Sequence, residues 1–140
     1  MFSLQASQGE LEGPLNDALA AGYRHIDTAA AYDNEDVIGK VLHEQWLGPG
    51  KLKREDLFIV TKLPTAGVRP GGPQKWLARS LEKLGLDYVD MYLVHTAMCA
   101  KEVDDSPFPM GPDGKMIFED TDHVAVWKVS LSHPHPHAAP

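Results

Sequence analysis

The sequence has few of the features that mark secreted, membrane-spanning or nucleic-acid-binding proteins. Its 140 residues include one cysteine, Cys99, so no disulfide can form within the chain, which fits a reducing compartment. No apolar run approaches the roughly 20 residues that span a bilayer. The 13 basic residues are outnumbered by 20 acidic ones, giving a formal net charge of −7, which argues against binding to nucleic acid or anionic membranes. The opening MFSLQASQGE has no basic and apolar regions typical of a signal peptide, and we expect a cytoplasmic chain.

Three kinds of functional motif are also missing. No glycine-rich phosphate loop follows any expected strand, and GVRPGG at 67–72 resembles such a loop only weakly. This disfavours a flavodoxin-like nucleotide-binding domain. No activating motif surrounds Cys99, so we interpret it as a loop thiol and not as a nucleophile. Three histidines alternate with prolines near the end of the chain, and we expect no metal site there.

The apolar and polar residues that are present predict alternating helices and strands. The apolar share of 43% and the charged share of 24% are ordinary for a globular domain. Apolar spacing and glycine or proline punctuation predict helices over 7–21, 34–47 and 73–84, and strands over 23–27, 57–63 and 88–95. This order indicates right-handed βαβ units and a parallel sheet. Asn34 or Asp33 is a candidate cap for the second helix.

The pattern changes after the third strand. Residues 96–121 are expected to form a long loop with a turn at the Pro-Asp-Gly of 112–114. Residues 122–128 can begin another helix. Residues 129–140 are expected to be a disordered tail, because alternating prolines cannot continue a helix.

Titratable residues fall at or near the ends of all three expected strands. Asp27, Lys62 and His95 occupy these positions, and Tyr32 follows in the loop after Asp27. The carboxyl ends of parallel strands form one rim, where active sites of such folds gather. Each residue alone has a structural explanation, as a cap, a solvated lysine or a satisfied histidine. Their coincidence on three strands favours a site, and Asp27 with Lys62 makes an ion pair that explains both charges.

The chemistry of such a site is acid–base chemistry on a carbonyl group. A phenol has a pKa of about 10, and a nearby ammonium lowers it by favouring the phenolate. A tyrosine in that setting can protonate an oxygen that gains negative charge, and a histidine can orient the carbonyl. The residues therefore predict carbonyl reduction with Tyr32 as the acid and a hydride supplied by a cofactor.

Three segments carry a resemblance to a known family. They are GYRHIDTAAAYDNEDVIGKVL at 22–42, REDLFIVTKL at 54–63 and LEKLGLDYVDMYLVH at 81–95. In these segments the chain resembles the aldo-keto reductases. The resemblance implies that Asp27, Tyr32, Lys62 and His95 are the catalytic residues, with Tyr32 and His95 contacting a small aldehyde or ketone. It also implies that NADPH supplies the hydride, that Asp27 and Thr28 bind the cofactor, and that Asp27 lies beside the nicotinamide ribose.

The chain departs from that family in its extent. Members are complete (β/α)8 TIM barrels of about 250 residues, so we expect a partial barrel over 1–128, holding about half of the strands, and an unrelated tail over 129–140. Leu4 stands where a pocket tryptophan is expected, and Thr96 where an aromatic residue is common. The segments that hold the cofactor phosphates are not recognisable, so NADPH binding is expected to be weak or absent.

A partial barrel leaves two interpretations open. Exposed sheet edges favour pairing with other chains, so we expect an unstable monomer that is molten, aggregates or self-associates. The first interpretation is an NADPH-dependent carbonyl reductase that works only if something restores the barrel. The alternative is a catalytically inactive truncated isoform, either inert or acting as a partner of the full-length enzyme.

Overall fold

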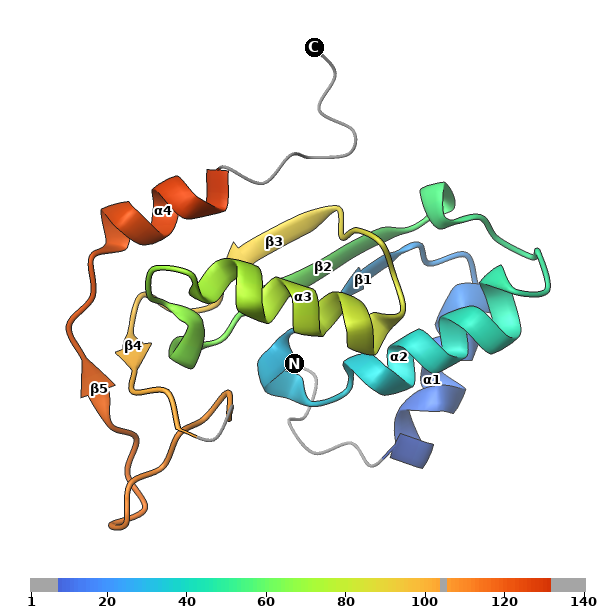
Figure 1. Ribbon diagram of the computed structural model, residues 1–140. Coiled ribbons are helices and arrows are strands. Elements are labelled where there is room, and N and C mark those ends of the chain that lie inside the picture. The colour runs from blue at the N-terminus through green and yellow to red at the C-terminus, as the bar shows by residue number, and fades with distance from the viewer. Residues whose placement is uncertain (1–7, 104–105, 132–140) are drawn as a thin grey trace. The chain divides into compact units, whose positions relative to one another are not determined.

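The computed structural model describes residues 8–103 and 106–131, and these divide into two compact units (Figure 1). The first unit contains residues 8–62 and 80–93. The second contains residues 63–79, 94–103 and 106–131. The predicted limits of the partial barrel, residues 1 and 128, stay a prediction.

The first unit is built on a three-stranded parallel sheet with helices, as the sequence predicts. The strands lie in the order β1-β2-β3, and β1 pairs in parallel with β2 so that Asp27 lies opposite Val60. The elements are β1 (His25–Asp27), β2 (Phe58–Leu63), β3 (Met91–Val94), α1 (Gln8–Ala20), α2 (Glu35–Val41), a π-helical continuation η2 (Leu42–Leu47) and α3 (Gly72–Leu84). The last residues of β2 and β3 and the first eight of α3 belong to the second unit.

Two glycines end helices of the first unit as the sequence predicts. Gly22 follows α1 with φ 97°, and Gly85 follows α3 with φ 64°. In each case the next amide reaches back five residues, from Tyr23 to Ala18 at 3.0 Å and from Leu86 to Leu81 at 3.1 Å. This is the Schellman arrangement, which needs a residue that tolerates positive φ.

The two faces of the sheet differ in how they are covered. Ile59 and Thr61 have no exposed surface and lie on the helix-covered face. Strand residues alternate between faces, and Phe58, Met91 and Leu93 lie on the opposite face. Their exposed fractions are 40%, 42% and 39%. The described residues therefore leave large apolar side chains exposed on one side of this sheet.

The second unit corrects the expectation of a plain loop over 96–121. This region contains β4 (Cys99–Ala100) and β5 (Phe118–Glu119), which pair antiparallel. The predicted turn is present between them, with the Gly114 amide donating to the Gly111 carbonyl at 2.9 Å. Strands of two residues are too short to show alternation, which explains why the sequence pattern did not reveal them.

Helix α4 (His123–Leu131) extends past residue 128, where the tail was expected to begin. That expectation is wrong for residues 129–131, which contain no proline. The first helix-incompatible position is Pro134, and a residue that precedes proline is biased away from the helical conformation. The rest of the predicted disordered tail, residues 132–140, lies outside the described residues.

No helix in the described part of the chain is long and apolar enough to cross a membrane. In residues 8–103 and 106–131, no cluster of three or more histidine, cysteine, aspartate or glutamate side chains could hold a metal ion. The three histidines of the His-Pro segment lie outside these ranges.

Candidate active site

An ion pair joins the ends of β1 and β2. Asp27 is the last residue of β1, and the Lys62 ammonium forms both an ion pair and a hydrogen bond with its Oδ1. The Lys62 side chain is 12% exposed and that of Asp27 is 54% exposed. The predicted ion pair is therefore present, with a shielded cation and a carboxylate that still meets solvent.

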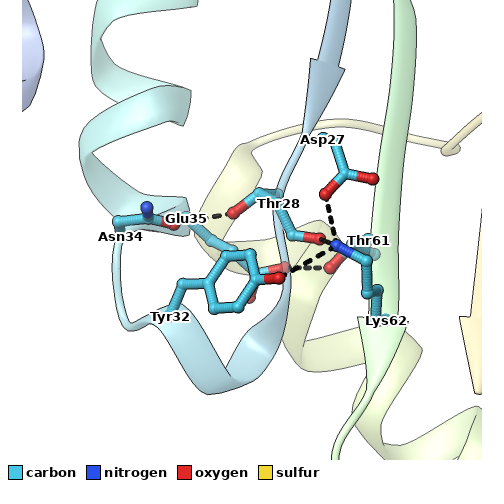
Figure 2. A network of polar contacts seen from close by, with 7 residues as sticks. All are labelled: Asp27, Thr28, Tyr32, Asn34, Glu35, Thr61 and Lys62. Atoms are coloured by element: carbon cyan, nitrogen blue, oxygen red, sulfur yellow. Dashed lines mark hydrogen bonds and ion pairs between the residues drawn. The ribbon is translucent and has the colours of Figure 1, made fainter. Parts of the chain in front are cut away.

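Tyr32 completes the contacts of the Lys62 ammonium. It ends a 3₁₀ turn, η1 (Ala30–Tyr32), directly after β1. Lys62 Nζ lies 3.3 Å from Tyr32 Oη and 3.0 Å from the Thr28 carbonyl oxygen. Figure 2 shows the ammonium between the Asp27 carboxylate, the Thr28 carbonyl and the phenol. The three donors of the ammonium thus have three oxygen acceptors.

The direction of the Lys62–Tyr32 hydrogen bond follows from the donors. An ammonium cannot accept a hydrogen bond, so the phenol oxygen is the acceptor in this contact and the phenol proton takes no part in it. This polarity suits a proton donor backed by a cation. The 3.3 Å separation exceeds the roughly 2.7–2.9 Å of a charge-assisted bond, and catalytic hydrogen bonds are often long before substrate binds.

Thr28 and Asn34 form a second contact beside this group. Thr28 has no exposed surface, and its hydroxyl donates to Asn34 Oδ1 at 2.6 Å. Asn34 occupies the N-cap position of α2, but its side chain makes no capping bond. The expected side-chain cap is therefore wrong, because Thr28 engages the amide oxygen. The predicted contact between Thr28 and a cofactor stays a prediction.

Glu35 is a polar residue of this network that the sequence reasoning missed. It begins α2, is 1% exposed, and accepts a hydrogen bond from the Thr61 hydroxyl at 2.6 Å. Burial raises the pKa of Glu35. The hydrogen bond from Thr61, the nearby Ser80 hydroxyl and the charge of Lys83 act in the opposite direction. The available signal was its spacing, because position 35 shares the apolar helix face of Ile38 and Leu42.

His95 is the fourth predicted residue, and it belongs to the second unit. It directly follows β3, and its backbone amide donates to the Leu63 carbonyl at 3.1 Å. The structure thus brings Asp27, Tyr32 and Lys62 together within the first unit. The meeting of His95 with these three residues stays a prediction.

Comparison with known proteins gives a consistent assignment. The Aldo/keto reductase family matches residues 5–123. Aldo-keto reductase family 1 member A1 of Gallus gallus is 42% identical over 125 residues, which are 89% of this chain and 38% of that protein. Human aldo-keto reductase family 1 member C4 is 42% identical over 112 residues, which are 80% of this chain and 34% of that protein.

Solved structures agree with the sequence relatives. The aldose reductase of Schistosoma japonicum aligns with a TM-score of 0.82 at 36% identity, covering 90% of this chain and 41% of that one. The aldose reductase of Giardia lamblia gives a TM-score of 0.82 at 29% identity, covering 92% and 43%.

The sheet and its helices are thus part of a (β/α)8 barrel, which confirms the predicted fold class. The chain belongs to the aldo/keto reductase family, whose members are oxidoreductases acting on carbonyl compounds. It spans less than half the length of the relatives described above.

Proposed function

We propose that this chain carries the proton-donating part of an NADPH-dependent reductase of small aldehydes and ketones. Tyr32 is the proton donor, Lys62 and Asp27 support it, and His95 orients the carbonyl group. The observation that supports this is the contact of Lys62 Nζ with Tyr32 Oη at 3.3 Å, made while Lys62 is paired with Asp27. Membership of the aldo/keto reductase family supports the substrate class.

The arrangement divides the work among three side chains. As a carbonyl carbon is reduced, its oxygen gains negative charge, and the Tyr32 hydroxyl transfers its proton to that oxygen. The phenol oxygen is then left with negative charge, which the adjacent Lys62 ammonium stabilises. Asp27 holds the ammonium in place through their ion pair and hydrogen bond.

The residues also fit one end of a nicotinamide cofactor. The Asp27 side chain is 54% exposed although it pairs with Lys62, so its carboxylate can accept a hydrogen bond from a ribose hydroxyl. NADPH, when bound, supplies the hydride. We propose from the sequence alone that the chain prefers NADPH to NADH, binds NADPH weakly and is cytoplasmic.

Cofactor affinity is measured by titrating NADPH while recording fluorescence from Trp46, Trp76 and Trp127. We expect no saturation in the low micromolar range. A dissociation constant at or below about 1 μM would contradict the proposed weak binding.

The decisive experiment compares turnover in matched tyrosine variants. NADPH oxidation with a small aldehyde is followed for the parent, Tyr32→Phe and Tyr23→Phe. Tyr23 is 69% exposed and lies outside the network of Figure 2, so its variant controls for loss of a phenol as such. We expect Tyr32→Phe to abolish any turnover above background and Tyr23→Phe to retain it. Equal rates in the parent and Tyr32→Phe would refute the proposed reductase.

A second candidate function is a non-catalytic chain that acts through association. The observation that favours it is the exposure of Phe58, Met91 and Leu93 on one sheet face, at 40%, 42% and 39%. Apolar side chains gathered on one face are typical of an interaction surface. Background-level turnover in the parent together with concentration-dependent self-association would favour this function over the first.

A further inference from the structure

Asn34, the N-cap residue of α2, and Glu35, its first residue, accept hydrogen bonds from residues next to the two members of the ion pair. Asn34 accepts the Thr28 hydroxyl at 2.6 Å, and Glu35 accepts the Thr61 hydroxyl at 2.6 Å. Thr28 directly follows Asp27, and Thr61 directly precedes Lys62. Figure 2 shows both bonds beside the ammonium and the phenol. The N-terminal end of α2 and its cap residue therefore contact the residue after β1 and a residue of β2, each adjacent in the chain to one member of the charged pair.

The hydrogen bond between Thr61 and Glu35 restrains the direction in which the Lys62 side chain projects from β2. Successive strand residues point to opposite faces, so Thr61 points toward the helices and Lys62 away from them. Thr61 has no exposed surface and its hydroxyl is held by Glu35. A strand anchored at Thr61 has little freedom to rotate, which fixes the direction of the next side chain.

The contact to the β1 side acts on the same ammonium. The Thr28 carbonyl oxygen accepts from Lys62 Nζ at 3.0 Å, and the Thr28 amide donates to the Val60 carbonyl at 2.9 Å. With its hydroxyl held by Asn34, Thr28 is fixed at three points. Its carbonyl is therefore a stable acceptor on the side of Lys62 that faces β1.

We propose that Glu35 is a positioning residue that acts through Thr61 to hold the Lys62 ammonium within reach of the Tyr32 phenol. The consequence for turnover rests on the proposed function, but the positioning itself can be measured without turnover. Neither Glu35 nor Thr61 touches the reacting atoms in this scheme, so each acts only through Lys62.

The buried position of Glu35 supports a role beyond packing. An ionisable group in an apolar face is costly unless it is hydrogen-bonded, and burial raises the pKa of Glu35. The charged groups around it are Lys83 on α3, which favours the carboxylate, and Asp36 on α2, which disfavours it. The β3 residue Tyr92 is also close enough for the Glu35 charge to raise its pKa. Either protonation state of a carboxyl can accept from a hydroxyl, so the Thr61 bond persists as Glu35 titrates.

The test observes the Lys62 ammonium directly in the full chain. In protein labelled with ¹⁵N lysine, an ammonium held by three acceptors exchanges its protons slowly and gives a visible ¹H–¹⁵Nζ signal, which Lys62→Arg assigns by its disappearance. Thr61→Val removes the hydroxyl with little change in shape, and Thr61→Ser restores it. Asp36→Asn, at an exposed position of the same turn, is the matched control. Thermal unfolding is recorded for every variant.

We expect the Lys62 protons to exchange about tenfold faster in Thr61→Val, the factor set by loss of one ordinary hydrogen bond. Thr61→Ser and Asp36→Asn should keep the parent signal. An unchanged signal in Thr61→Val, or an equal change in Asp36→Asn, would overturn the proposal.

Glu35→Gln decides the question if Thr61→Val does not fold. The glutamine carbonyl can still accept the Thr61 hydroxyl, so the Lys62 signal should be retained, and its loss in a folded variant would overturn the proposal. A parent with a slow Lys62 signal but no carbonyl reduction would refute the proposed function and leave the positioning role intact.

Discussion

Lys62 Nζ lies 3.3 Å from Tyr32 Oη while the same ammonium is paired with Asp27. The phenol, the cation and the carboxylate come from the end of β2 and from β1 with its following turn. A cation placed this way can stabilise negative charge on the phenol oxygen, and its own charge is compensated by Asp27. The proposed role of the arrangement in catalysis therefore depends on the Lys62 ammonium, and a variant that lacks the ammonium tests this role directly.

Lys62→Met should reduce any NADPH-dependent carbonyl reduction by about 10²- to 10⁴-fold, the usual contribution of a positioned acid–base group. The effect should fall on kcat, because the ammonium acts on charge that develops during proton transfer. Lys83→Met is the matched control, since Lys83 pairs with Asp33 at 3.1 Å and is 43% exposed. Comparable losses in the two variants, or loss of circular dichroism in Lys62→Met alone, would contradict a catalytic role for the ammonium.

Tyr92→Phe should raise the free energy of unfolding by about 1 kcal/mol at neutral pH. Within the described residues, the Tyr92 hydroxyl is buried and has no hydrogen-bond partner, and an unsatisfied buried hydroxyl costs about 1–3 kcal/mol. Denaturant unfolding of the parent, Tyr92→Phe and the exposed-site control Tyr23→Phe measures the change. A destabilised Tyr92→Phe variant with an unchanged control would show that the hydroxyl has a stabilising partner.

The parent should also lose stability in strong alkali because of Tyr92. Burial, and secondarily the charge of Glu35, raises the pKa of Tyr92 well above the ordinary value of 10.0. Above that ordinary value the unfolded chain releases the phenolic proton and the folded chain does not, so the free energy of unfolding falls as pH rises. Tyr92→Phe should remove this part of the decline in denaturant titrations. An identical alkaline profile in both proteins would contradict the assignment.

Glu35→Gln should change the stability profile in mildly acidic solution. Burial raises the folded pKa of Glu35 above the ordinary 4.5, so the folded state binds more protons between the two values. The free energy of unfolding therefore falls as pH rises from the ordinary value through the raised one, and then levels off. Glu35→Gln has no proton to lose and should lack this decline. Urea unfolding between acid and neutral pH measures it, and a decline of equal size in the variant would exclude Glu35 as its source.

The sequence was enough to predict the three strands of the parallel sheet and the Asp27–Lys62 ion pair. Apolar runs and helix-ending glycines such as Gly22 located the elements, and the placement of Asp27 and Lys62 at strand ends predicted their pairing. These features depend on local pattern and on the topology of parallel sheets. A site built from strand ends can therefore be predicted from the order of residues in the chain.

The hydrogen bonds behind the site could not be predicted in the same way. The position of Asn34 before α2 predicts a helix cap, but the buried Thr28 hydroxyl takes its side chain. The partner of Glu35 is Thr61, which is 26 residues away in the chain. Such contacts depend on how the helix packs on the sheet, so they cannot be predicted from the spacing of residues along the sequence.

The exposed sheet face leads to a prediction about association. Phe58, Met91 and Leu93 keep 40%, 42% and 39% of their surface exposed, and side chains of this size gain about 1.5–3 kcal/mol each when fully buried. We expect the parent to self-associate with rising concentration, and the double variant Phe58→Thr, Leu93→Thr to be more monomeric, because threonine keeps strand propensity and removes apolar surface.

Tyr23→Thr, at a side chain that is 69% exposed, is the control for loss of an exposed aromatic residue. Sedimentation velocity across a concentration series measures the distribution. A parent that stays monodisperse and monomeric, with a sharp cooperative melt, would contradict the expectation that the chain self-associates through this face.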